Sequence, residues 1–206
     1  MKLKNSLTTT LIVVIAGFFI IANYAPTITW GHLTLQDNLL LIRHARFPED
    51  GFSTYHGVYA GEWWRVFTVV LTHANWLHLG SNMLVFFQLG NIVEHYYGKA
   101  RYSFILIASA LTASFSCLLL DPANQASVGA SGMIFGLFGV MLVSGKRMNV
   151  DFRQVLGLLV LNIVFSFVPG VDWHAHAGGF VGGLVVALIL QAIPPRQSHQ
   201  SHQSVY

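Results

Sequence analysis

The sequence predicts an all-α membrane protein, a six-transmembrane-helix bundle with a long interfacial first loop. Composition is the first reason: 54% of the 206 residues are hydrophobic and only 9% are charged, whereas soluble domains carry roughly 25% charged residues. Patterning is the second reason, because the apolar residues gather in runs close to the roughly 20 residues that a helix needs to cross a bilayer. We expect one domain.

Six apolar runs predict the helices. They cover residues 7–24, 77–93, 102–120, 128–144, 152–168 and 175–193. The fourth and fifth runs lie near the lower limit of about 17 residues for a membrane span. We therefore expect a short cytoplasmic N-terminus at residues 1–6, a six-span domain over residues 7–195 and a disordered polar tail at residues 196–206.

The positions of Lys and Arg predict the orientation. With the N-terminus inside, most of the 11 basic residues fall in cytoplasmic loops and tails, namely Lys2, Lys4, Lys99, Arg101, Lys146, Arg147, Arg153 and Arg196. Cytoplasmic loops of membrane proteins carry an excess of Lys and Arg. Both termini are then inside, and the second, fourth and sixth runs all begin at the outer face.

The connection between the first two runs is long and carries tryptophans at its ends. Trp30, Trp63 and Trp64 flank an apolar stretch at residues 33–42. Because Trp is enriched at membrane interfaces, this pattern indicates an element lying in the headgroup layer. A plain extracytoplasmic loop is the alternative.

Composition also argues against two classes of function. The net charge of +3 comes from scattered basic residues, so we expect no nucleic-acid partner. The single cysteine, Cys117, excludes a disulfide framework. We interpret it as a small hydrophobic core residue.

Polar residues recur at the predicted outer ends of three runs, at the same membrane depth. His78 and Asn82 are four residues apart and share a helical face, while Ser131 opens the fourth run and His176 opens the sixth. Strongly polar groups inside a bilayer are costly and by default imply function. A histidine can take the proton of a serine hydroxyl, which makes the hydroxyl a nucleophile. Asn82, the His78 ring and backbone N–H groups could then stabilise a tetrahedral oxyanion.

Small residues make such a meeting possible. Gly132, Gly136 and Gly139 line the fourth run, and Gly179 and Gly183 repeat at four residues in the sixth. Small residues at this spacing let membrane helices approach closely. The alternative is tight packing without chemistry.

Each polar residue also has a structural alternative. Ser131 could be a helix N-cap, and Asp172 could either cap the sixth helix or orient His176. We expect Phe135, one turn beyond Ser131, to pack against the His176 ring. His73 and His174, at loop edges, fit interfacial or supporting positions.

These motifs resemble those of the rhomboid intramembrane serine proteases. Residues 129–132 have the family's Gly-x-Ser-Gly order, and residues 175–183 have its Ala-His-x-x-Gly-x-x-x-Gly order. Residues 73–82 match its His-x-x-x-x-His-x-x-x-Asn pattern, and residues 62–65 resemble the Trp-Arg motif of its first loop. The similarity extends over nearly the whole chain.

The resemblance implies a Ser131–His176 catalytic dyad, with His78, Asn82 and the Ser131 backbone forming the oxyanion hole. It implies supporting roles for Phe135, Gly129, Gly132, Gly179, Gly183, His73, Trp64 and Arg65.

It further implies single-pass transmembrane substrates, no metal and no cofactor. The location it implies is a bacterial inner membrane, with the site toward the periplasm. By analogy, residues 152–168 and the Pro169-Gly170 loop form a mobile gate.

Two other functions fit parts of this pattern. A catalytically inactive rhomboid-like protein could capture client helices on the same scaffold, although both Ser131 and His176 are present. A metal or haem protein could use His73, His78, His174 and His176, but His174 and His176 are two residues apart and point to different helical faces. The chain also lacks a His-Glu-x-x-His motif.

Overall fold

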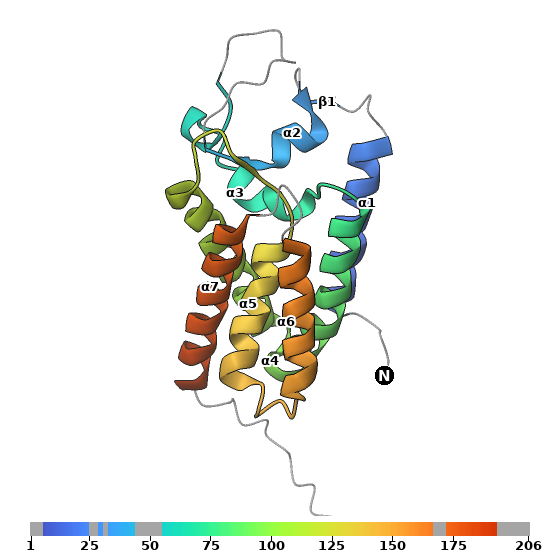
Figure 1. The fold of residues 1–206 in the computed structure, drawn as a ribbon, viewed down its shortest axis with the longest axis vertical. Helices are drawn as coiled ribbons and strands as arrows, with labels where there is room; N and C mark the ends of the chain where they lie inside the picture. Colours follow the sequence, from blue (N-terminus) through green and yellow to red (C-terminus); the bar gives the residue numbers. More distant parts are fainter. Residues whose placement is uncertain (1–5, 25–28, 31–32, 44–54, 167–171, 193–206) are drawn as a thin grey trace, which may run out of the picture.

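The computed structural model of the chain is mostly helical and describes residues 6–24, 29–30, 33–43, 55–166 and 172–192. Within this part, five helices stand side by side along the long axis of the molecule (Figure 1): α1 (Leu7–Tyr24), α4 (Trp76–Leu120), α5 (Ser131–Ser144), α6 (Phe152–Ser166) and α7 (Trp173–Ala192). Three of them, α1, α4 and α7, are long and apolar enough to cross a membrane, and α5 and α6 are shorter apolar helices. This arrangement is a membrane helical bundle.

The longest helix, α4, spans 45 residues and is broken at Gly98. A straight helix of that length would measure about 68 Å, roughly twice the thickness of a bilayer core. Gly98 has φ 73° and ψ 161°, a backbone conformation that favours glycine. The chain reverses direction at Gly98, so that the two arms of α4 pack against each other. Their contact is close, since a Cβ on Gly90 would lie 2.6 Å from the hydroxyl of Tyr102 on the other arm. The two arms correspond to the second and third predicted runs.

A buried carboxylate ties α1 to the first arm of α4. Glu94 accepts hydrogen bonds from the backbone N–H groups of Leu7 (2.7 Å) and Thr8 (2.9 Å) and from the Thr8 hydroxyl (2.8 Å). The first N–H groups of a helix have no partner within it, and the helix dipole favours a negative charge at that end. Glu94 therefore fixes where α1 begins, at the residue that the sequence predicted.

Glycines bring α5 and α7 into backbone contact. A Cβ on Gly179 would overlap the carbonyl oxygen of Gly132, and a Cβ on Gly183 would overlap that of Gly136. On the other face of α7, a Cβ on Gly178 would lie 2.6 Å from the Thr112 carbonyl oxygen of α4. The expectation that small residues let the fourth and sixth helices approach closely is confirmed.

Two predicted helix starts were displaced by a few residues. Helix α7 begins at Trp173, ahead of the predicted residue 175, and α5 begins at Ser131 instead of residue 128. The later start of α5 has a physical cause: Ser127 is paired in a strand, and Gly129 has φ 110° and donates its N–H to the Val69 carbonyl oxygen. The Pro169-Gly170 loop and the tail at residues 196–206 lie outside the described residues.

Short elements cover the end of the bundle where α4, α5 and α7 begin (Figure 1). Strands β1 and β2 pair antiparallel, as do β3 and β4, with Leu41 opposite Ser127 in the second pair. The elements are β1 (Thr29–Trp30), β2 (Leu33–Thr34), α2 (Leu35–Leu39), β3 (Leu41–Ile42), η2 (Val58–Ala60), α3 (Arg65–Thr68), η3 (Val69–Leu71) and β4 (Ala126–Ser127). The pairing of β3 with β4 connects this cover to the segment that leads into Ser131.

Arg65 holds the cover together from within. Its side chain is wholly buried and donates to Glu62 Oε2 (2.7 Å) and to the carbonyl oxygens of Asp37 (2.5 Å) and Leu40 (3.0 Å). The neighbouring Trp64 donates its indole N–H to the Asn38 carbonyl oxygen (3.0 Å). The Trp-Arg pair thus joins α3 to α2. Part of the apolar stretch at residues 33–42 is accordingly protein core, since Leu39, Leu40, Leu41 and Ile42 are buried.

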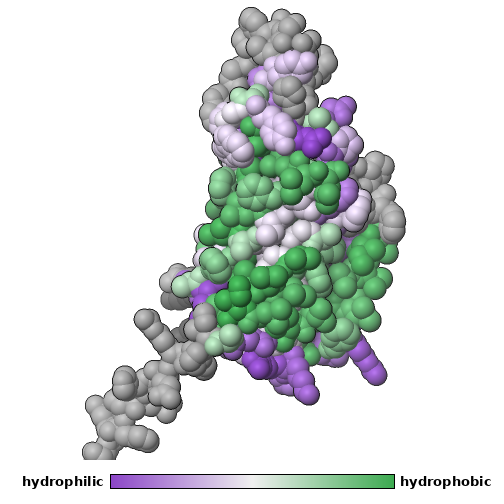
Figure 2. Space-filling view, turned by 90° about the vertical axis from the view of Figure 1, so that its left-hand side faces the viewer, coloured by the Kyte–Doolittle hydropathy of each residue, from purple (hydrophilic) through white to green (hydrophobic). Residues whose placement is uncertain are grey.

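One face of the molecule shows a broad apolar belt over the helices, with hydrophilic residues gathered at both ends (Figure 2). Exposed apolar side chains occur on every long helix, among them Val13, Phe104, Leu156, Val185 and Leu188. A continuous apolar belt of exposed side chains is typical of a surface that faces lipid.

The Gly183→Ala substitution should destabilise the bundle, because the new methyl group has no room against Gly136. Overpacking a tight contact typically costs about 1–3 kcal/mol. Gly157→Ala on α6 is the matched control, since a Cβ there meets nothing within 4 Å. Thermal unfolding in detergent should show a lower Tm for Gly183→Ala and an unchanged or slightly higher Tm for Gly157→Ala. Equal melting of the two variants would contradict the close contact.

Glu62 should make the stability of the cover depend on pH. Burial alone would raise the pKa of Glu62, but hydrogen bonds from His56, Arg65 and the Gly57 N–H lower it below the ordinary value of 4.5. The unfolded chain then takes up this proton more readily than the folded chain. Glu62 therefore contributes its full stabilisation at pH values above its unfolded pKa of 4.5, and this stabilisation is lost as the pH falls through its lower pKa in the folded protein.

We expect Glu62→Gln to lower the Tm at about pH 7, where it leaves a buried Arg65 without its charged partner, at a typical cost of about 3–5 kcal/mol. The difference from the wild type should shrink as the pH falls through the lowered pKa of Glu62, where Glu62 itself becomes protonated. Asp151→Asn, at an exposed position, is the control and should show a small difference at every pH. A constant Tm gap between wild type and Glu62→Gln over this range would rule out the predicted role of the carboxylate.

Candidate active site

Ser131 is the first residue of α5, and its hydroxyl faces α7. The Ser131 Oγ atom lies 2.9 Å from Nε2 of His176, and both side chains are buried. The N-cap position belongs to Ala130, which has no capping side chain, so the alternative of Ser131 as an N-cap is wrong. The pair joins residues 45 positions apart in the sequence.

An aromatic neighbour stacks on the ring of His176 and fixes its orientation. Phe135 stacks on it with ring centroids 4.0 Å apart and an interplanar angle of 7°. Phe135 lies four residues beyond Ser131 and therefore on the same face of α5. The expected packing of Phe135 on His176 is confirmed, and because it uses the face of the ring, Nε2 at the ring edge contacts Ser131.

Unpaired nitrogen donors lie beside the serine. His78 and Asn82 come from the first turns of α4, and a Cβ on Gly129 would lie 2.8 Å from His78 Cε1 and 3.5 Å from Asn82 Nδ2. Both ring nitrogens of His78 and the amide nitrogen of Asn82 are buried without a hydrogen-bond partner in the described part of the chain. A buried unpaired donor typically costs about 1–3 kcal/mol. These donors are therefore available to an oxygen atom that enters the site.

His73 packs behind His78. The two rings meet edge to face with centroids 5.1 Å apart, and the ring of Phe19 of α1 meets His73 edge to face at 6.4 Å. His73 is fully buried. Burial, and then the neighbouring His78, lower the pKa of His73 to about 3, so its ring is neutral. A neutral, fully buried ring with two aromatic neighbours fits a supporting position.

Asp172 caps α7. Its Oδ1 atom accepts hydrogen bonds from the N–H groups of His174 (2.9 Å) and Ala175 (3.4 Å), while its Oδ2 atom accepts one from Ser127 (2.5 Å). The capping alternative for Asp172 is thus the one that the geometry fits. The ring of His174 lies between two carboxylates, with Nδ1 2.5 Å from Oδ1 of Asp121 and 3.6 Å from Oδ1 of Asp172.

The four histidines considered for a metal or haem site do not form one cluster. Among the described residues, the group of metal-ligand side chains that lie within reach of one another consists of Cys117, Asp121 and Asp172. Burial, and then the neighbouring Asp172 carboxylate, raise the pKa of Asp121 to about 6. Sequence reasoning missed this group. The four-residue spacing of Cys117 and Asp121 was the one signal that could have indicated it.

A small cavity of about 20 Å³ lies beside the serine. Its lining includes Ser131, Gly132, Ser127, Cys117 and Asp172. A cavity needs roughly 10–15 Å³ to hold one water molecule. The cavity that Ser131 helps to line therefore has room for one water molecule.

The fold and the site together define a helical membrane protein with a buried serine–histidine pair. A family model described as "Rhomboid domain" matches residues 60–193. The chain belongs to the rhomboid family.

Individual relatives agree with this assignment. The rhomboid protease GluP of Bacillus subtilis (strain 168) is 34% identical over 136 residues, which cover 63% of this chain and 26% of GluP. YdcA of the same organism is 33% identical over 139 residues, covering 65% of this chain and 70% of YdcA. The rhomboid-type serine protease 2 of Emericella nidulans is 31% identical over 154 residues, covering 71% of this chain and 31% of that protein. This chain thus spans less than a third of the length of two of these relatives.

Proposed function

We propose that the protein is an intramembrane serine endopeptidase that cleaves peptide bonds in or near the transmembrane segments of other membrane proteins. The observation that carries the proposal is the 2.9 Å contact between Ser131 Oγ and His176 Nε2, made beside the unpaired amide of Asn82. The proposal is supported by the names of relatives that are rhomboid proteases. It needs no metal and no cofactor.

In this mechanism His176 is the general base. Its Nε2 atom takes the proton from Ser131 as Oγ bonds to the carbon of the scissile carbonyl, and the resulting imidazolium then gives that proton to the leaving amine. A water next to the acyl-enzyme repeats the cycle, losing its proton to His176 and releasing the carboxylic acid and the free serine hydroxyl. The stacked Phe135 ring keeps Nε2 directed at the hydroxyl throughout.

The developing oxyanion would be stabilised by side-chain nitrogens that lack a hydrogen-bond partner among the described residues and by a backbone N–H at a helix start. The Asn82 amide, a His78 ring N–H and the Ser131 backbone N–H at the start of α5 are the candidates. Because these donors are fixed before the substrate arrives, no reorganisation is needed when charge develops. At Gly129 a side chain would collide with His78, so the glycine keeps the approach to these donors clear.

The substrates we propose are single-pass membrane proteins that enter from the lipid bilayer. A membrane helix hides all of its peptide groups in its own hydrogen bonds, so the bond to be cut must unwind before attack. This requirement favours substrates with helix-breaking residues near the cleaved bond.

We further propose that the chain crosses the membrane six times with both termini in the cytoplasm. The two arms of α4, together with α1, α5, α6 and α7, would supply the crossings over residues 7–195. The candidate site lies at the end of the bundle where α4, α5 and α7 begin, so this orientation puts it toward the periplasmic side of a bacterial inner membrane. The distribution of Lys and Arg supports it.

Replacing either member of the dyad should abolish cleavage. We expect Ser131→Ala and His176→Ala each to lower kcat by about 10⁴-fold or more against a purified membrane substrate with a destabilised helix. Ser103→Ala and His95→Ala, on α4, are the matched controls and should cleave normally. Cleavage retained by Ser131→Ala would overturn the dyad, and a wild type that binds the substrate without cleaving it would favour an inactive rhomboid-like binding protein.

Asn82→Ala should act on turnover more than on binding. Removing one oxyanion donor typically lowers kcat by about 10²- to 10³-fold, and a group that acts only in the transition state leaves KM nearly unchanged. Steady-state kinetics in detergent or proteoliposomes measure both constants. A rise in KM at constant kcat would instead assign Asn82 to substrate binding.

A further inference from the structure

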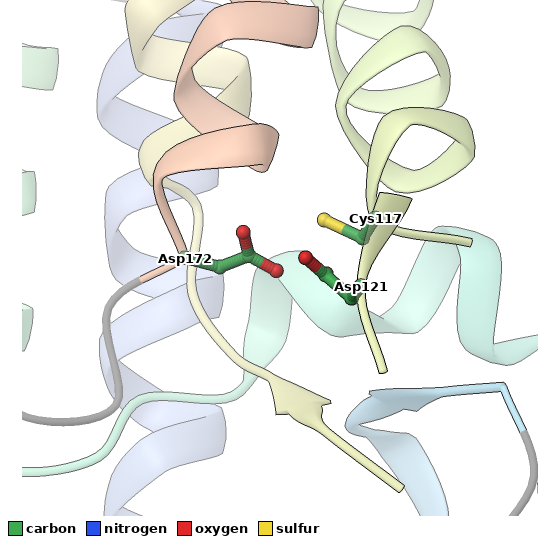
Figure 3. A group of neighbouring side chains, drawn as sticks. All are labelled: Cys117, Asp121 and Asp172. Atoms are coloured by element: carbon green, nitrogen blue, oxygen red, sulfur yellow. The ribbon is translucent and has the colours of Figure 1, made fainter. Parts of the chain in front are cut away.

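Three metal-ligand side chains meet where α4 ends and α7 begins. Cys117 and Asp121 are four residues apart, which places both on one face at the C-terminal end of α4. Asp172 comes from the residue before α7, and the three side chains point toward one another (Figure 3). Asp172 lies 51 positions after Asp121 in the sequence, so the packing of α7 against α4 brings it to the other two.

The cluster is compact and closed to solvent. One ligand atom from each residue lies within 4.8 Å of the others, and the exposed fractions are 4% for Cys117, 5% for Asp121 and 6% for Asp172. Bonds to zinc measure about 2.0–2.3 Å for oxygen and sulfur, so two ligands of one ion lie about 3–4 Å apart. The three ligand atoms, at up to 4.8 Å from one another, would therefore draw closer on binding one ion.

One oxygen of the cluster has no partner. Oδ2 of Asp121 is buried and makes no hydrogen bond within the described chain, while Oδ1 contacts His174 Nδ1 at 2.5 Å. The nearby Arg43 donates to the Leu118 carbonyl oxygen instead (3.1 Å). Two buried carboxylates in contact repel each other unless a proton or a cation lies between them. A cation at this position would pair with the Oδ2 oxygen and separate the two carboxylates.

We propose that Cys117, Asp121 and Asp172 bind a zinc ion. A thiolate ligand disfavours magnesium and calcium, which take oxygen ligands, whereas zinc accepts sulfur and carboxylate oxygen together. Zinc binding would release the thiol proton of Cys117. His174 would hold the Asp121 carboxylate in place from outside, as hydrogen-bonded neighbours of metal ligands do. The fourth position would be open to a water from the adjoining cavity, which Cys117 and Asp172 also line.

The ion would be a structural clamp. It would tie the end of α4 to the residue that caps α7, and this residue lies one helical turn before His176. Zinc would thereby fix the position of the histidine without taking part in proton transfer. This inference departs from the sequence-based expectation of no metal and from the interpretation of Cys117 as an ordinary core residue.

The test uses cobalt as a spectroscopic substitute for zinc in full-length protein first freed of metal with a chelator. Because Cys117 is the single cysteine, a thiolate-to-cobalt charge-transfer band in the near ultraviolet can arise only there. We expect this band to appear when cobalt is added and to disappear when zinc displaces the cobalt. The Tm should rise with zinc concentration. Cobalt bound elsewhere, for example by histidines, gives no such band.

Variants decide which residues bind. Cys117→Ser should abolish the band, while Asp121→Asn and Asp172→Asn should weaken cobalt affinity by more than tenfold, since even an outer partner of a metal site is typically worth about 10- to 100-fold. Asparagine still caps a helix, so Asp172→Asn should remain folded, and Asp151→Asn is the matched control. No band in the wild type, or a band insensitive to both aspartate variants, would overturn the site. Ser131→Ala should keep the band, so this result is independent of protease activity.

Discussion

The approach of α5 to α7 is the contact on which the candidate site depends. The Cα atoms of Gly179 and Gly183 rest against the carbonyl oxygens of Gly132 and Gly136, where no other residue type would fit. Water cannot drive this association within a bilayer, so close packing of backbones must supply the attraction. The 2.9 Å contact between Ser131 and His176 lies directly above this seam. A separation of the two helices by the width of one methyl group would break it.

The other parts of the fold keep the seam in place. The first arm of α4 delivers His78 and Asn82 to the same end of the bundle, and Glu94 ties that arm to α1. The cover anchored by Arg65 reaches the serine through the strand pairing of Leu41 with Ser127. The site therefore draws on elements from most of the chain, although its chemistry is assigned to a few side chains.

Features that repeat locally could be predicted from the sequence. The first apolar run predicted both ends of α1 correctly. Helical spacing placed three sets of residues each on one helical face: His78 with Asn82, Ser131 with Phe135, and the glycines of α7. What the sequence could not supply were contacts between distant segments. Arg65 is wholly buried, which is rare for its type, because carbonyl oxygens of a separate element surround it. The grouping of Cys117 and Asp121 with Asp172 depends likewise on how α4 meets α7.

The unpaired nitrogens of His78 and Asn82 have a consequence for evolution and engineering. Well-packed proteins leave few buried polar atoms unsatisfied, so two such side chains beside one serine mark a place where the resting protein forgoes stability. A chain selected only for heat resistance would replace Asn82 with an apolar residue early, and in doing so would lose the arrangement proposed to catalyse. Here the most stable sequence and the most active sequence cannot be the same.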